Sequence, residues 1–535
     1  MSQLPQPVPE YDFSRRQIFW AMFAVFTVYG TMSFLIQALN VARPRMAAEL
    51  NGMPLYAWSV SIPGLVGAFT TLIYGKLSDM YGRRRMLLIS VIFSLVGTAL
   101  SALSTNFIFL IIASAIASLG SGAMMPLVFA VVGDIFPPAR RSKWIGLLNI
   151  PMGICALFGP TLGGWFVDNL SWRYLFWATI PLLAVCLVTV PIGVPSLVGN
   201  AGKRKIDFRG CLLVGIASST LIIGFSFAGT TYPWGSPRII GLLAISLVFW
   251  ILFFVAEGRT EEPILDPEVL GNRSFLTVAV ATLFSFFGQM ALMMYFPMFL
   301  QGVQGISATL SGKIITPYSV LMAFVGVPVG FLLARTKRYK WMYVLGFATL
   351  TADMFGIIFF SEKTPILWSV LACTFAGLGL GAIPTVNTMV IQNAVPKRLL
   401  GVAMGGIFFA ISMGVAISPA LLGSVMNASY NKALNHLMPP ALKESADEAT
   451  IASIGDPKVL LSRPAMAALE ASFKNGGGHG QELFNQTVQA IRKSMEAGLR
   501  SVFLLSAITM LLAFIIICTV PQISWETEAS RKKCS

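Results

Sequence analysis

Charged side chains and histidines are scarce in this 535-residue sequence. Charged residues make up 11% of it, against 56% hydrophobic residues. Soluble domains carry about 25% charge, so the composition excludes an ordinary soluble enzyme. The two histidines, His436 and His479, lie in one polar segment and leave no histidine cluster for a catalytic metal. We therefore expect no metal, no cofactor and no enzymatic activity.

Cysteines are few as well, and their positions exclude redox chemistry. Cys534 lies in the terminal tail, and the other five lie inside apolar runs: Cys155, Cys186, Cys211, Cys373 and Cys518. No CxxC pair occurs, so neither a disulfide framework nor a cysteine metal site is expected. A cleavable signal peptide is not expected either, because the apolar run after Arg15 and Arg16 is too long for one.

Apolar runs of about 20 residues recur along the chain, and each is long enough to cross a bilayer as a helix. They predict an all-α polytopic membrane protein with fourteen transmembrane helices. These are expected near residues 18–42, 56–75, 86–105, 107–131, 144–166, 174–195, 210–229, 239–256, 275–298, 311–334, 341–360, 365–386, 400–424 and 500–520. An even number of spans predicts that both termini lie on one side.

The net charge of +15 would suggest nucleic acid in a soluble protein, but the positions of the basic residues suggest a membrane. Most of them fall in the tails and in the loops on the terminal side. Short loops and span mouths on the other side hold only Arg43, Arg45, Arg173, Arg238, Lys313 and Lys363. The positive-inside rule then places both termini in the cytoplasm. We expect a multi-pass monomer in the plasma (cell inner) membrane, with the lipid bilayer and no nucleic acid as partner.

One polar segment, residues 425–499, interrupts the series of apolar runs and is expected on the outer side. Within it, Phe484, Val488, Ile491 and Met495 recur at helical spacing and predict an amphipathic helix. Loops longer than about 15 residues are functional or disordered. Two interpretations therefore remain open: a lid or hairpin on the outer face, and a solvated loop with no role.

The loop between the second and third spans carries a motif, Gly75-Lys-Leu-Ser-Asp79-Met-Tyr-Gly82-Arg83-Arg84-Arg85. It resembles the signature gating loop of the major facilitator superfamily. We expect Asp79 at the N-terminus of the thirteenth span, near Leu400 and Gly401, where the helix dipole favours a carboxylate. Arg83 is expected to pair with Asp134 at the end of span four.

The fifth span contains Gly159-Pro160-Thr161-Leu162-Gly163-Gly164, in which small residues allow close helix packing and proline supplies a kink. It resembles the GPxxGG element of superfamily exporters. Ser171 to Phe176 and Asn40 to Pro44 resemble elements of the fourteen-span drug:proton antiporter branch. The resemblance implies six-helix bundles in residues 1–195 and 275–535, the latter including the outer loop, with two inserted helices and linkers in 196–274.

The sequence also departs from that branch. Leu35 stands where the branch usually has an aspartate, and Ser114, Ala117 and Ser118 stand where it has Arg, Gln and Gly. The only acid well inside a predicted span is Asp353, so it is the candidate for proton coupling. By analogy its span is a peripheral support helix, and a structural, hydrogen-bonded role for Asp353 stays open.

Uncharged polar residues in the presumed central helices are the candidates for substrate binding. They are Gln37, Asn40, Asn149, Gln289, Tyr318 and Asn387. Hydrogen bonding from helix to helix is the alternative role for each of them. The function that we expect is alternating-access export of small amphiphilic organic compounds, with proton coupling left open. Two alternatives are an uncoupled or differently coupled carrier of a neutral or anionic metabolite or lipid, and a non-transporting membrane sensor or scaffold.

Overall fold

The computed structural model describes residues 14–136, 144, 147–195, 208–228, 232–260, 267–336, 338–395, 400–440, 456–474 and 480–521. Within these ranges every regular element is a helix, and the single β-bridge joins Ala228 and Tyr232. The expectation of an all-α membrane protein is confirmed.

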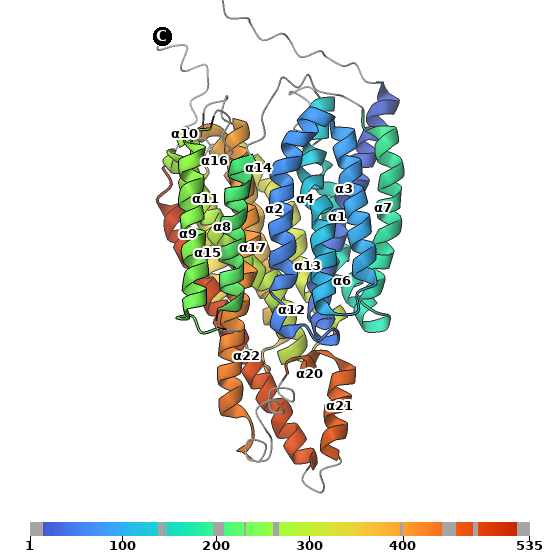
Figure 1. Ribbon diagram of the computed structural model, residues 1–535, viewed down its shortest axis with the longest axis vertical. Coiled ribbons are helices and arrows are strands. Elements are labelled where there is room, and N and C mark those ends of the chain that lie inside the picture. The colour runs from blue at the N-terminus through green and yellow to red at the C-terminus, as the bar shows by residue number, and fades with distance from the viewer. Residues whose placement is uncertain are drawn as a thin grey trace, which may run out of the picture.

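Six long helices form the N-terminal bundle, drawn blue to teal in Figure 1. They are α1 (Arg15–Glu49), α2 (Trp58–Tyr81), α3 (Arg83–Ala102), α4 (Phe107–Ile135), α6 (Asn149–Asn169) and α7 (Arg173–Gly193). Helix α1 packs against α6 and α7, whereas α4 packs against α2 and α3. Local signals set the helix starts, because Ser14 forms a capping box with Gln17 and the Asn106 side chain accepts from the Phe109 amide.

The remaining long helices form the C-terminal bundle and the pair beside it. The bundle consists of α11 (Arg273–Met290), η2 (Ala291–Tyr295), α12 (Phe296–Met298), η3 (Phe299–Val303), α13 (Ala308–Phe324), α14 (Gly326–Thr336), α15 (Lys340–Ile357), α16 (Ile366–Ala394), α17 (Leu400–Leu437) and α22 (Gly480–Cys518). Segments η2 and η3 are π-helical, and their residues are all buried. Helices α11, α15 and α17 all pack against α22.

Helices α8 (Phe208–Phe227) and α9 (Pro237–Glu257) pack against each other beside the C-terminal bundle, where α8 also touches α17 and α2 (Figure 1). Most apolar side chains of α9 are exposed, as on a surface that faces lipid. A short helix, α10 (Pro267–Leu270), leads into α11.

Eleven helices in the described ranges are long and apolar enough to cross a membrane. Three expected spans are not among them: they correspond to α2, α8 and α15. Residues Leu212–Phe225 of α8 form an apolar helix that is shorter than the others. A multi-span membrane fold is therefore confirmed, and the number fourteen stays a prediction.

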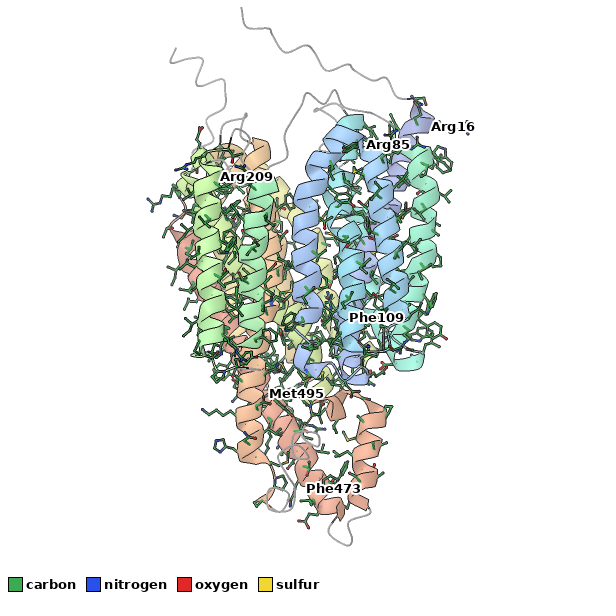
Figure 2. The ribbon with its side chains drawn as sticks, in the orientation of Figure 1. Arg16, Arg85, Phe109, Arg209, Phe473 and Met495 are labelled. Atoms are coloured by element: carbon green, nitrogen blue, oxygen red, sulfur yellow. The ribbon has the colours of Figure 1, made fainter. Side chains whose placement is uncertain are left out.

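The two ends of the molecule differ. Helix α1 begins and α22 finishes at the same end, called here the terminal end, and Figure 2 shows Arg16, Arg85 and Arg209 there. At the opposite loop end, where η1 (Met53–Leu55) joins α1 to α2, α17 and α22 extend beyond the bundles beside α20 (Lys458–Leu461) and α21 (Arg463–Lys474) (Figure 1). We call α20, α21 and residues 480–499 of α22 the lobe; Phe473 lies at its tip (Figure 2).

Candidate functional site

The two bundles meet most closely where α6 crosses α13. A Cβ atom built on Gly164 would lie 2.4 Å from the Ala308 carbonyl oxygen, and one on Gly312 would lie 2.3 Å from the Pro160 carbonyl oxygen. Contacts this short leave no room for any side chain. Glycine at both positions is therefore what lets the backbones of the two bundles touch.

The other face of α6 packs against α1. A Cβ atom on Gly163 would lie 2.7 Å from the Ala38 carbonyl oxygen, and one on Gly159 would lie 2.7 Å from the Gln37 Cβ atom. Pro160 lies inside the helix between them. The four residues expected to form the exporter element thus lie where α6 is held between α1 of its own bundle and α13 of the other.

Hydrogen bonds join the bundles toward the loop end. The Tyr56 hydroxyl donates to the Met294 carbonyl at 2.9 Å, and the Gln301 side-chain amide donates to the Val41 carbonyl at 3.2 Å. Asp168 accepts from the Thr309 amide at 2.7 Å. Met294 and Gln301 both lie on π-helical segments, whose wider turns are frequent at functional sites.

The gating loop is a sharp turn between α2 and α3. Gly82 has φ 91°, a left-handed conformation that favours glycine. Arg83 donates to the Ser78 hydroxyl, and Arg84 is half-buried. Gly75 and Asp79 lie on α2 and Asp134 on α4, but their surroundings, like those of Leu400 and Gly401, lie outside what the structure describes. The two expected gate contacts therefore stay predictions.

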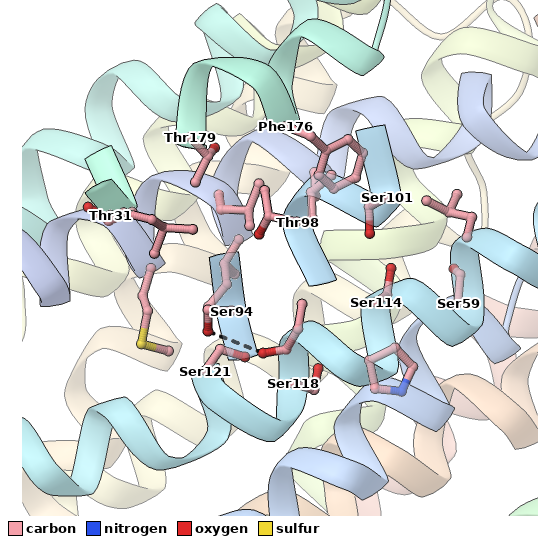
Figure 3. Close-up of a pocket in the computed structure, with 18 of the residues that line it drawn as sticks. Thr31, Ser59, Ser94, Thr98, Ser101, Ser114, Ser118, Ser121, Phe176 and Thr179 are labelled. Atoms are coloured by element: carbon pink, nitrogen blue, oxygen red, sulfur yellow. Dashed lines mark hydrogen bonds between the residues drawn. The ribbon is translucent and has the colours of Figure 1, made fainter. Parts of the chain in front are cut away.

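A cavity of about 160 Å³ lies inside the N-terminal bundle, among α1, α2, α3, α4 and α7. Nine hydroxyl side chains line it (Figure 3): Thr31, Ser59, Ser94, Thr98, Ser101, Ser114, Ser118, Ser121 and Thr179. Among the described residues that line it, Arg43 is charged and none is an acid. The four positions where the sequence departs from the antiporter branch all contribute to its wall: Leu35, Ser114, Ala117 and Ser118.

Most of these lining residues were missed by the sequence analysis. Ser94, Thr98 and Ser101 follow one face of α3, and Ser114, Ser118 and Ser121 follow one face of α4, each with the spacing i, i+4, i+7. The two helices pack side by side, and the Ser94 hydroxyl donates to the Ala117 carbonyl at 3.2 Å. The matching spacings were a signal that the sequence did contain.

Three of the expected substrate-binding residues lie at helix contacts. Gln37 faces Gly159 of α6. The Asn40 side chain accepts from the Arg43 guanidinium at 2.6 Å. The Asn387 side chain donates to the Thr282 hydroxyl at 2.9 Å, which joins α16 to α11. The side chain of Asn149 lies outside the described part of the chain.

Two other expected residues, Gln289 and Tyr318, lie near each other in the C-terminal bundle. Gln289 contacts the sulfur atoms of Met293 and Met322. The buried Tyr318 hydroxyl lies close to Gln289 but makes no hydrogen bond of standard geometry within the described ranges. Both residues lie in the other bundle from the hydroxyl-lined cavity. The six candidates are thus not brought together in one described pocket.

Asp353 lies on α15, which packs against α16 and α22. One of its carboxylate oxygens is buried and has no hydrogen-bond partner in the part of the chain that the structure describes. Cys373 on α16 is close enough to interact electrostatically with both Asp353 and Tyr318. In the described ranges, no group of three or more His, Cys, Asp or Glu side chains could hold a metal ion.

The lobe is attached to the C-terminal bundle and touches the N-terminal one. Arg492 of the lobe forms an ion pair with Glu362, and just after the lobe the Arg500 Nε atom donates to the Ile358 carbonyl at 3.1 Å. Helix α20 packs against both α1 and η3, where Leu461 approaches Gly302. The lobe therefore covers the loop end where the two bundles meet.

Comparisons with known proteins agree with this architecture. The family model described as Major Facilitator Superfamily matches residues 18–419. Relatives include the uncharacterized MFS-type transporter Rv1877 of Mycobacterium tuberculosis (strain ATCC 25618 / H37Rv), 32% identical over 77% of this chain and 59% of that protein. The chain thus spans less than two thirds of the length of that relative.

Multidrug resistance protein 3 of Bacillus subtilis (strain 168) is 28% identical over 95% of this chain and 97% of its own length. A crystal structure of a bacterial homolog of the human lysosomal transporter Spinster, inward-facing and unoccupied, superimposes with a TM-score of 0.59. It is 15% identical and covers 96% of this chain and 100% of that one. At this identity the likeness is one of fold.

Proposed function

The chain belongs to the major facilitator superfamily, and from that premise we propose that it exports small amphiphilic organic compounds by alternating access of its two bundles. Names of relatives such as Multidrug resistance protein 3 support efflux. The bundles would rock about a substrate site near the middle of the membrane.

The observation that carries this proposal is the pair of glycine contacts between α6 and α13. Gly164 and Gly312 each bring the backbone of one bundle against the other without intervening side chains. Smooth backbone contacts of this kind allow two rigid bodies to pivot without repacking long side chains. A non-transporting scaffold would not require them.

A transport assay tests the proposal. The purified chain is reconstituted in liposomes with an imposed pH gradient and offered cationic, neutral and anionic amphiphiles of similar size. We expect protein-dependent movement of at least one class, and its loss in Gly164→Leu. Transport equal to that of protein-free liposomes for every class would overturn the proposal.

A carrier without proton coupling is the second candidate, and the cavity favours it. Leu35 and Ser114 are neutral where the antiporter branch has an aspartate and an arginine, and no carboxylate is among the described residues that line the cavity. Asp353 remains the candidate for coupling because it is a buried acid, one oxygen of which has no partner among the described residues. The same liposome assay separates the two, since only a coupled carrier responds to the pH gradient by accumulating substrate.

The orientation in the membrane belongs to the proposal too. We place the terminal end in the cytoplasm and the loop end outside, with fourteen spans in a monomer of the plasma (cell inner) membrane. The basic residues at the terminal end support this orientation. Cysteine replacements at Tyr81 and Lys432 provide a test, because a membrane-impermeant reagent should label only the second from outside intact cells. Labelling of both from one side would contradict the topology.

For the gating loop, Asp79 would hold the N-terminus of α17 and Arg83 would hold Asp134 when the terminal end closes. Asp79→Asn should then slow transport at unchanged protein abundance, and unchanged transport would contradict this role.

For the lobe, contacts with both bundles support a role as an outer lid. Breaking the Arg492–Glu362 ion pair with Arg492→Gln should increase the access of solutes to the loop end. Unchanged access in this variant would contradict the lid role.

A further inference from the structure

We propose that the hydroxyl-lined cavity of the N-terminal bundle binds the anionic headgroup, carboxylate or phosphate, of an amphiphilic substrate, with Arg43 as the charged anchor. This inference rests on the proposed export function and names the substrate class that the function would serve. It concerns a different place from the polar residues of the C-terminal bundle.

Among the described residues, Arg43 has fewer partners than Arg45 and Arg173, the other arginines near this end of the bundle. Arg45 lies 4.0 Å from Asp168, and Arg173 stacks over Trp172 while donating to the Ser104 carbonyl. Arg43 has one hydrogen bond, to the Asn40 side chain. In the described part of the chain, no carboxylate lies within ion-pair distance of it.

Nearby acids already have other partners. Glu49 accepts from the Trp172 indole at 2.8 Å, and Asp168 accepts from the backbone of Ala308 and Thr309. A guanidinium carries five donors in a planar fork that matches a carboxylate or a phosphate. Because most of the Arg43 donors have no acceptor among the described residues, an anion in the cavity would satisfy them.

The hydroxyls supply the rest of an anion site. Thr98, Ser114, Ser118 and Ser121 line the cavity, and in the described ranges they have no hydrogen-bond partner in the protein. A hydroxyl donates one hydrogen bond, so these groups can complete the shell around anionic oxygens. The described lining offers a cation a positive charge and no carboxylate, so the cavity favours an anion.

Size and wall composition indicate a headgroup instead of a whole molecule. The cavity volume of about 160 Å³ is below the ~300–1,000 Å³ of pockets that enclose drug-sized ligands. Leu35, Leu39, Leu110 and Phe176 form apolar wall beside the hydroxyls. This combination fits an ionised headgroup with an apolar body that continues outside the cavity.

Binding of a matched pair of probes to the full chain in lipid nanodiscs tests the proposal. The probes are 11-(dansylamino)undecanoic acid and its methyl ester, which share fluorophore and chain and differ in headgroup charge. We expect the acid to bind at least about tenfold more tightly than the ester. Arg43→Gln should weaken acid binding by about 10- to 100-fold, the range for hydrogen bonds to charged groups, and leave ester binding unchanged.

Three variants act as controls. Arg43→Lys keeps the charge and should restore part of the acid affinity. Arg238→Gln removes the same charge from an exposed position at the start of α9, and should bind both probes as the wild type does. If Arg43→Gln fails to fold, Ser118→Val decides: removing that hydroxyl should weaken acid binding by up to about tenfold.

Equal affinity for acid and ester in the wild type, or acid binding insensitive to both Arg43→Gln and Ser118→Val, overturns the headgroup site and leaves the export proposal standing. Conversely, Arg43-dependent binding of the acid without its movement across liposome membranes supports the site and refutes export of this class. The two failures are thereby distinguishable.

Discussion

The interiors of the two bundles differ in how they are filled. The N-terminal bundle encloses a cavity with hydroxyls and an arginine on its wall. The C-terminal bundle is packed with large side chains, among them Phe296, Phe299 and Phe503, which contact one another and are almost fully buried. One of its polar groups, the Asn387 side-chain amide, donates to Thr282 on a neighbouring helix.

This difference indicates that the two bundles have different roles. A densely packed bundle acts as a rigid body, because close-packed interiors deform little. A bundle with a polar cavity can receive a ligand without first opening its core. We infer that selectivity lies mainly in the N-terminal bundle and that rigidity lies mainly in the C-terminal one.

The largest effect is expected from a deletion in the packed interior. Phe299→Ala removes a ring that stacks on Phe296 and meets Phe503 edge to face, and truncations of buried phenylalanine cost about 3–5 kcal/mol. Denaturant titration in detergent measures the loss. The control is Phe359→Ala, whose ring is 78% exposed. Similar losses for the two variants would show that the C-terminal interior is not tightly packed.

The next effect comes from separating the bundles. Gly164→Ala places a methyl group against the Ala308 carbonyl, and overpacking of this kind costs about 1–3 kcal/mol. Transport should also slow, because α6 and α13 can no longer pivot in contact. Gly235→Ala is the control, since nothing lies within 4 Å of a Cβ atom there. A Gly164→Ala protein with normal melting and transport would contradict the close contact.

A smaller effect on stability, but a specific one on activity, is expected for Asp353→Asn. The substitution keeps size and polarity, so the free energy of unfolding should change by less than about 1 kcal/mol. If Asp353 carries the proton, the variant loses accumulation driven by a pH gradient and keeps downhill exchange. Accumulation that persists would move coupling to a terminal-end acid such as Asp79 or Asp134, or exclude protons.

The smallest effect is expected in the cavity. Thr98→Val removes a hydroxyl without a described protein partner at almost constant volume, so we expect a change of about 0.5 kcal/mol or less. In the other bundle, Thr351→Val removes a hydroxyl that donates to the Phe347 carbonyl at 2.8 Å, and about 1 kcal/mol should be lost. Equal losses of stability for the two variants in thermal melts would contradict the proposed difference between the two interiors.

The sequence predicted most helices because apolar runs and capping residues are local signals. The span expected at 107–131 begins at Phe107 as predicted, after the Asn106 cap. The last span was expected at 500–520 with a separate amphipathic helix before it. The structure joins both into α22, Gly480–Cys518. No proline lies between them, and the one glycine there, Gly498, is tolerated within the helix.

The cavity could not be predicted from the sequence in the same way. Serine and threonine in apolar helices often bond to their own backbone, as Ser101 does to Gly97, so their presence alone does not indicate a pocket. Only the relative rotation of α3 and α4 decides which hydroxyls face a common space. Likewise, the π-helical turns at Met294 and Gln301 depend on hydrogen-bond register, which composition does not encode.

The length of α22 has a mechanical consequence. Its 39 residues extend about 58 Å at ~1.5 Å per residue, so about 28 Å lies beyond a hydrocarbon core ~30 Å thick. This overhanging part of α22 moves with the C-terminal bundle, and its tip moves farthest. A tilt of that bundle by about 10° would swing the tip by roughly 5 Å, given the same rise and thickness. Spin labels on α21 and α7 would record this swing as a change in distance, so the lobe would amplify a small rotation within the membrane into a displacement outside it.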